Sequence, residues 1–239
     1  MTDARDPDAP EPVPAHPSAT VVLLRDAPDP TGGLEVLLGH RGAELTFHGG
    51  EWVFPGGRVD PEDCLDGAPP GSLDAARRAA VRECAEEVGA HVTATSLRAW
   101  SHWTTPVRWK KRFATWFFLA PFADQALRVD GVEMQTCRFM RPAEALAQQA
   151  SGALGLPPPT FVTLVELCAF ASVHEALAAA ERREPPAIFP RVHRVDDGAV
   201  SLYPGDAGYE VGALDAPGPR HRLVMRQSGW RYVNERQRT

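Results

Sequence analysis

Short apolar runs alternate with turn-forming residues over the first two thirds of the chain, and each run predicts a strand. Residues 19–26 are apolar and rich in β-branched side chains, which is typical of a buried strand. Residues 34–41 follow after a turn and predict its hairpin partner, and residues 51–57 predict a short strand ending in a glycine turn. Three further strands are expected at 96–106, 112–122 and 131–140.

Helical patterns lie between and after these strands. Residues 72–89 are rich in Ala, Arg and Glu, with Ser72 placed as an N-cap and Gly89 where a C′ glycine belongs. Residues 141–151 predict a short helix, and residues 157–184 predict one long helix or two shorter ones. Mixed strands with interspersed helices predict an α/β (α+β) fold, a sandwich of helices around a mixed central sheet.

The two ends of the chain differ in texture from its middle. Residues 1–18 are rich in Pro, Asp and Ala and lack the apolar core of a signal peptide, so we expect a disordered leader. Residues 19–184 predict the main domain. From residue 185 the pattern changes to short strands and turns. This extension, 185–239, is expected to pack on the sandwich or to help build a homodimer.

Composition narrows the function classes. The chain has 239 residues and a net charge of −6, and its basic clusters are short, so we expect no nucleic-acid partner. No apolar run approaches the length of a membrane span, so no membrane association is expected either. The four cysteines are scattered without CxxC spacing, which favours reduced thiols and a cytoplasmic location.

The helix predicted at 72–89 carries the candidate chemistry. Glu83, Glu86 and Glu87 are three and four residues apart, so they share one face, which we expect to point outward. Like charges at this spacing weaken a helix, whereas a divalent cation turns the repulsion into binding; oxygen-only ligands suit Mg²⁺ or Mn²⁺. Arg82 is placed to orient Glu86, four residues on. An acidic run by itself more often marks a solvated helix face.

The surrounding letters specify more than an acidic run. Residues 82–90, RECAEEVGA, follow FPGG at 54–57, and together they resemble the signature of the Nudix hydrolases, G-x5-E-x7-R-E-U-x-E-E-x-G-U, where U is an aliphatic residue. Counting back seven residues from Arg82 places Asp74 at the first glutamate, and sixteen residues then separate Gly57 from Asp74 where five are usual. This register implies an insertion at 58–73, a feature of the CoA diphosphatase branch of the family.

The resemblance implies metal-dependent hydrolysis of a diphosphate in a small-molecule substrate, a nucleoside diphosphate joined to another group. The branch implies CoA or acyl-CoA, giving 3′,5′-ADP and 4′-(acyl)phosphopantetheine. ADP-ribose, NADH or a nucleotide sugar is the alternative substrate, since Pro106 lies sixteen residues after Ala90, close to a spacing of fifteen in some ADP-ribose hydrolases. A Nudix fold that senses a nucleotide without cleaving it is the third alternative.

The resemblance also suggests roles for residues around the acidic helix. Glu83, Glu86 and Glu87 would hold the metal, with Arg82 beside them and Glu133 as a candidate base or extra ligand; a plain surface glutamate remains open for Glu133. The expected substrate-binding residues are Gly56 and Gly57, whose backbone can approach phosphates closely, together with Arg41, His48 and Arg112. The polar segment 58–73 is expected to stay out of the core as a lid or a substrate-selecting loop, or to be a plain surface excursion.

Overall fold

The computed structural model describes residues 13–29, 31–45, 48–107 and 109–237, so most of the predicted leader, 1–12, lies outside the described residues. The chain divides into two compact units. Among the described residues, the large unit comprises those of Pro17–Trp103 and Thr115–Pro186, and the small unit comprises 13–16, those of Thr104–Ala114, and 187–237.

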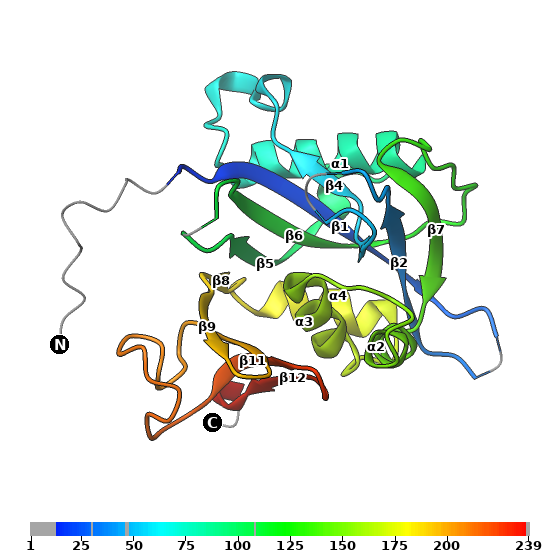
Figure 1. Ribbon diagram of the computed structural model, residues 1–239. Coiled ribbons are helices and arrows are strands. Elements are labelled where there is room, and N and C mark those ends of the chain that lie inside the picture. Colours follow the sequence, from blue (N-terminus) through cyan, green and yellow to red (C-terminus); the bar gives the residue numbers. More distant parts are fainter. Residues whose placement is uncertain (1–12, 30, 46–47, 108, 238–239) are drawn as a thin grey trace. The chain divides into compact units, whose positions relative to one another are not determined.

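A mixed sheet forms the centre of the large unit (Figure 1). Its main path runs in the order β3-β2-β1-β6-β5, while β4 pairs with β1 and β7 pairs with β2. The pairs that β1 makes with β2 and β4 are antiparallel, as are those that β2 makes with β3 and β7. Backbone hydrogen bonds join His16 to Arg112 at one end and Leu24 to Phe122 at the other, so β1 and β6 run parallel. The strands are β1 His16–Asp26, β2 Leu34–Arg41, β3 Trp52–Val53, β4 Gly56–Arg58, β5 Arg98–Thr104, β6 Phe113–Pro121 and β7 Met134–Met140.

Two strand predictions need correction. Strand β1 begins at His16, so the end of the predicted leader is part of the sheet: Ser18 pairs with Arg58 of β4. The single strand expected at 51–57 is two strands, because β3 pairs with β2 while β4 pairs with β1. The chain crosses from one partner strand to the other between Val53 and Gly56, a change that a local apolar pattern does not reveal.

Helices cover both faces of this sheet, which confirms the expected sandwich. Helix α1, Leu73–Val88, lies on one face, and α2 Pro142–Ala150, α3 Pro158–Leu167 and α4 Val173–Arg182 lie on the other (Figure 1). Alternate residues of a strand point to opposite faces. Val21 and Leu23 of β1 pack in the same cluster as residues of α1, and Val22 and Leu24, which alternate with them along the strand, are also fully buried. The region 157–184 forms two helices, α3 and α4, which is one of the two alternatives predicted for it.

The small unit contains β8 Ala187–Ile188 and a separate antiparallel sheet. The strands of that sheet are β9 Arg191–Val195, β10 Gly198–Leu202, β11 His221–Arg226 and β12 Gly229–Asn234, in the order β12-β11-β10-β9. The buried Asp206 carboxylate accepts hydrogen bonds from Arg222 Nε at 2.7 Å and Nη2 at 2.6 Å, which fixes the connection between β10 and β11. Across the described ranges, no helix is both long enough and apolar enough to cross a membrane.

Candidate active site

Helix α1 presents the acidic residues from its last two turns. Ser72 Oγ accepts the N–H of Ala75 at 3.2 Å, and Gly89 ends the helix with a left-handed φ of 67°, as the sequence predicts. Alanines and Cys84 pack its buried face against the sheet. The helix is therefore fixed at both ends and along one side, so the acidic residues near its C-terminus have defined positions.

The three acidic side chains differ sharply in exposure. The Glu86 side chain is 60% exposed, Glu83 is 14% exposed and Glu87 is only 3% exposed. The expectation of three outward-pointing carboxylates is therefore wrong for Glu87. Its carboxylate accepts the backbone N–H of Gly56 at 2.8 Å and lies 3.4 Å from Arg41 Nη1, so strands β4 and β2 cover it.

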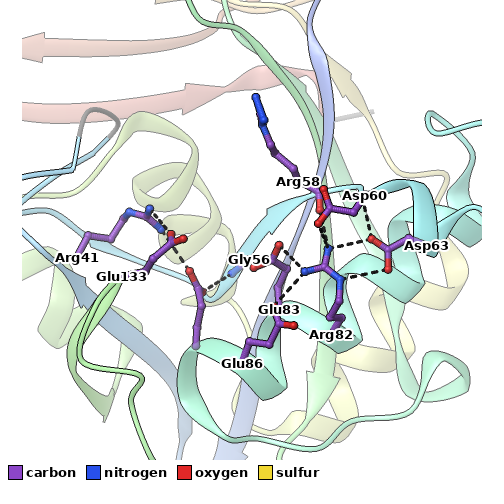
Figure 2. A network of polar contacts seen from close by, with 10 residues as sticks. Arg41, Gly56, Arg58, Asp60, Asp63, Arg82, Glu83, Glu86 and Glu133 are labelled. Atoms are coloured by element: carbon purple, nitrogen blue, oxygen red, sulfur yellow. Dashed lines mark hydrogen bonds and ion pairs between the residues drawn. The ribbon is translucent and has the colours of Figure 1, made fainter.

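Arg82 is the centre of a polar network (Figure 2). Its Nη1 donates to Glu83 Oε1 at 2.9 Å and to Glu86 Oε2 at 3.1 Å, and the second contact is the one that the i,i+4 spacing predicts. Its Nη2 donates to Asp63 Oδ2 at 2.9 Å and to the carbonyl of Arg58 at 3.0 Å. Arg82 thus orients two of the three acidic side chains of the helix.

Asp63 changes the register of the Nudix pattern. It follows Gly57 by six positions, which is the ordinary G-x5-E spacing with aspartate in place of glutamate. Its side chain is buried, and it contacts both Nε and Nη2 of Arg82. Asp74, which the sequence placed at this position, is 73% exposed and pairs with Arg77 of its own helix at 3.3 Å. The eleven extra residues therefore lie between Asp63 and Arg82, not between Gly57 and the acidic position.

The segment predicted to stay out of the core is tied to α1. It contains the short 3₁₀ helices η1, Pro61–Asp63, and η2, Leu65–Gly67. The Asp63 carbonyl accepts Arg78 Nε at 2.6 Å in addition to the contacts of its side chain. The polar composition of the segment did not predict that Asp63 is buried, because a carboxylate can be buried when a cation such as that of Arg82 pairs with it. A role of 58–73 as a lid or substrate-selecting loop stays a prediction.

Arg41 and Glu133 meet on the other side of the acidic helix (Figure 2). Arg41 Nη2 lies 2.8 Å from Glu133 Oε2 while its Nη1 faces Glu87, so one guanidinium bridges two carboxylates from different elements. Glu133 is half exposed just before β7. Arg41 was predicted to bind substrate; its contacts here are with acidic side chains, and substrate binding stays a prediction.

The two glycines are required by close contacts. A Cβ on Gly57 would lie 2.3 Å from Glu83 Oε1, and a Cβ on Gly56 would lie 2.3 Å from the carbonyl oxygen of Ala19. Any side chain at Gly57 would therefore displace the Glu83 carboxylate. These contacts explain the glycines without a ligand, and their contact with phosphate stays a prediction.

Two predicted substrate-binding residues have other contacts in the structure. His48 Nδ1 pairs with the Glu51 carboxylate of the same loop. Arg112 belongs to the small unit, where its Nη1 donates to the carbonyl of Val13 at 2.7 Å and its Nε donates to the carbonyl of Thr105 at 3.1 Å. Their proposed roles toward a substrate stay predictions.

Burial and like charge perturb the buried acidic residues. Burial raises the pKa of Glu87 to about 8; Gly56 N–H and Arg41 oppose that shift, and the charges of Glu83 and Glu133 add to it. Burial also raises the pKa of Glu83, against the hydrogen bond from Arg82. Two carboxyl groups held this close in a partly dry site favour either protonation or a bound cation.

The donor chemistry fits a hard divalent cation. Within the described ranges, no group of three or more His, Cys, Asp or Glu side chains is already gathered as a metal site. The side chains that meet Arg41 and Arg82 here offer carboxylate oxygens: Glu83, Glu86, Glu87 and Glu133 carry four negative charges when ionised, against two positive charges on the two arginines. Oxygen-only donors with excess negative charge suit Mg²⁺ or Mn²⁺, which keep several waters as ligands.

A helix of acidic residues behind a glycine turn, on a mixed sheet covered by helices, is the arrangement expected of a hydrolase that acts on a diphosphate. Comparison with known proteins agrees, since the NUDIX domain family model matches residues 14–158. The chain therefore belongs to the Nudix hydrolase family, as its sequence indicates.

Similar proteins agree with this family, although each matches only part of its sequence or has a low sequence identity. The chain is 33% identical over 127 residues to the acyl-coenzyme A diphosphatase NUDT19 of Xenopus laevis, covering 48% of this chain and 32% of that protein. It is 30% identical over 168 residues to the putative nudix hydrolase 7 of Caenorhabditis elegans, covering 55% of each. The chain thus spans between a third and about half of these relatives. The crystal structure of a NUDIX hydrolase from Alicyclobacillus acidocaldarius has the same fold, with a TM-score of 0.61, 23% identity and coverage of 70% of this chain and 96% of that one.

Proposed function

We propose that this protein hydrolyses the diphosphate linkage of CoA or acyl-CoA, releasing 3′,5′-ADP and 4′-(acyl)phosphopantetheine. The observation that carries the diphosphatase activity is the set of acidic side chains on α1, with Glu83 and Glu86 oriented by Arg82 and Glu87 enclosed by Gly56 and Arg41. Such a set suits a reaction in which negative charge must be neutralised around a phosphorus centre.

Glu83, Glu86 and Glu87 would hold Mg²⁺ or Mn²⁺, which when bound neutralises diphosphate charge and lowers the pKa of a water ligand. Nudix hydrolases generally use divalent metal ions, and the choice between these two is part of the proposal. Arg82 keeps Glu83 and Glu86 in place, and Arg41 keeps Glu87 next to Glu133. Glu133, half exposed at the edge of the acidic set, accepts the proton of the attacking water.

The choice of CoA rests on two supports. One is the similarity to acyl-coenzyme A diphosphatases, which covers about half of this chain. The other is the extra segment of eleven residues between Asp63 and Arg82, because an insertion inside the signature is a feature of the CoA branch. ADP-ribose, NADH and nucleotide sugars contain the same diphosphate linkage, so they are the competing substrates in the test.

A product-resolved screen tests the proposal. CoA, acetyl-CoA, a long-chain acyl-CoA, ADP-ribose, NADH and a nucleotide sugar are each incubated with the protein and Mg²⁺ or Mn²⁺, and products are separated by chromatography and mass. We expect 3′,5′-ADP from the CoA compounds and loss of the activity in Glu86→Gln, which keeps the shape of the side chain. Faster cleavage of ADP-ribose or NADH would reassign the substrate, and tight nucleotide binding with no product from any compound would identify a sensing module.

Two further expectations concern the protein in the cell. We expect a cytoplasmic location, checked by fractionation with marker enzymes, and a homodimer that involves residues 185–239, checked by light scattering after gel filtration. A monomer at micromolar concentration would remove the second expectation without affecting the first.

A further inference from the structure

The turn that leads into β7 is built around Asp130, a residue outside the Nudix pattern. Its Oδ2 accepts the N–H of Glu133 at 3.0 Å, and its Oδ1 accepts the N–H of Val132 at 3.2 Å and that of Met134 at 2.8 Å. Gly131 takes a left-handed φ of 75° inside the turn. Three backbone donors on one carboxylate make a tight turn from a segment that is otherwise exposed.

This turn is attached to the acidic helix on one side and to β2 on the other. The N–H of Asp130 donates to the carbonyl of Glu87 at 3.1 Å, and Glu133 accepts through its own carbonyl the N–H of Gly42 at 3.1 Å. Asp130 therefore lies one hydrogen bond from the backbone of the most buried acidic residue of α1, and the far end of the turn lies beside Arg41, the residue before Gly42.

The side chain fixed by these contacts is that of Glu133. Its carboxylate meets Arg41 Nη2 at 2.8 Å, and the same guanidinium faces Glu87. Glu133 is half exposed, and its carboxylate is held by the hydrogen bond from Arg41, so its position depends on its backbone and on Arg41. Loss of the Asp130 carboxylate would free three backbone N–H groups and loosen the segment that carries Glu133.

We propose that Asp130 is a positioning residue that holds Glu133 at the acidic site, an inference that rests on the proposed diphosphatase function. Asp130 acts through the backbone of Glu133 and has no direct role toward the substrate. Removing it reduces turnover only while Glu133 has a carboxylate to position.

A double-mutant cycle tests this coupling. In the wild-type background, Asp130→Ala is expected to lower kcat for the best diphosphate of the screen about tenfold and to leave KM within about threefold. In the Glu133→Gln background, the same substitution is expected to change kcat by less than twofold, because the positioned group is already lost. Asp130→Asn keeps one oxygen acceptor and is expected to restore most of the loss. An equal loss in both backgrounds would overturn the inference.

Asp29 supplies the matched control. It also caps an exposed turn of the large unit, accepting the N–H of Thr31 at 3.0 Å, and it pairs with Arg141 at 2.6 Å. Asp29→Ala removes a comparable turn contact from a different loop and is expected to leave kcat within twofold of wild type. If it lowers kcat as much as Asp130→Ala does, the effect is one of general loosening and the inference fails.

Hydrogen exchange separates this inference from the proposed function. The amides of Glu133 and Met134 are expected to exchange at least tenfold faster in Asp130→Ala than in wild type, with residues 73–80 of α1 unchanged. Unchanged exchange at these amides overturns the positioning role whatever the enzyme's activity. A wild-type protein that cleaves no diphosphate, with exchange altered as expected, overturns the proposed function and leaves Asp130 as a residue that only holds the turn.

Discussion

Replacing Asp63 with alanine tests how the Nudix pattern is laid out in this chain. In the structure, Asp63 is 4% exposed and contacts two nitrogens of Arg82, at 3.4 and 2.9 Å. Asp74, the alternative acidic position, is largely exposed and lies 3.3 Å from Arg77. The two substitutions remove the same chemical group from opposite ends of the extra segment, so each is a control for the other.

The expected losses differ by about an order of magnitude. Breaking a buried ion pair costs about 3 to 5 kcal/mol, and the 20% exposure of Arg82 reduces this to about 2 to 3 kcal/mol for Asp63→Ala. An exposed pair three residues apart on a helix contributes about 0.3 kcal/mol, the expected loss for Asp74→Ala. For a domain of this size, the first loss lowers Tm by about 5 to 10 °C and the second by about 1 °C.

Thermal unfolding and steady-state kinetics measure both effects. Because Arg82 also orients Glu83 and Glu86, Asp63→Ala is expected to reduce kcat about tenfold or more at a temperature where the variant is folded. Asp63→Glu, which restores the residue usual at this position of the pattern, is expected to recover part of the activity. Wild-type behaviour of Asp63→Ala, with a strong defect in Asp74→Ala, would refute the register derived from the structure.

Three other substitutions test separate parts of the account. Gly57→Ala places a Cβ 2.3 Å from Glu83 Oε1 and is expected to lower kcat/KM at least a hundredfold, with an unchanged circular dichroism spectrum. Near-normal activity would show that the position of the Glu83 carboxylate is not critical. The pKa of Glu87 is about 8 in the folded state against 4.5 in the unfolded chain, so the stability that its protonated form contributes is present below pH 4.5 and is lost as pH rises to 8, by about 4 to 5 kcal/mol. Glu87→Gln should flatten this slope in metal-free protein and abolish turnover, whereas an unchanged slope would contradict the assignment. Burial lowers the pKa of His221 to about 4 from 6.5, so the free energy of unfolding of the small unit should fall by about 2 kcal/mol between pH 7 and pH 5, as measured by urea unfolding. His221→Gln should remove this pH dependence, and equal stability of the small unit at both pH values would contradict the prediction.

Local chemistry was sufficient to predict the elements whose ends carry their own signals. Helix α1 starts after Ser72 and ends at Gly89 because a capping hydroxyl and a left-handed glycine satisfy its terminal backbone groups. Strand β2 has the predicted bounds, 34–41, because a glycine turn precedes its apolar run and the run ends in His40 and Arg41 before Gly42. The mixed sheet with helices on both faces follows from the order of such elements.

The burial of individual acidic residues could not be predicted in the same way. Asp63 and Glu87 are buried because Arg82 and Arg41 reach them from distant positions, and no pattern in a single sequence states which cation meets which carboxylate. The five residues between Gly57 and Asp63 match the first spacing of the Nudix signature. The seven residues between Asp74 and Arg82 match its second spacing, and counting from Arg82 therefore selected Asp74 in place of Asp63. The position of Asp130 beside α1 could not be predicted either, because it depends on the pairing of β7 with β2 and on a backbone contact with Glu87.

A titration with Mn²⁺ tests most directly whether the carboxylates of α1 bind metal, since the electron paramagnetic resonance spectrum of Mn²⁺ distinguishes free from bound metal. We predict that wild-type protein binds Mn²⁺, that a diphosphate tightens the binding, and that Glu83→Gln and Glu87→Gln each weaken it at least tenfold while the proteins stay folded. Wild-type protein that leaves Mn²⁺ free at millimolar concentration with and without a diphosphate, or Gln variants that bind it as wild type does, would contradict the claim that these carboxylates of α1 hold the catalytic metal.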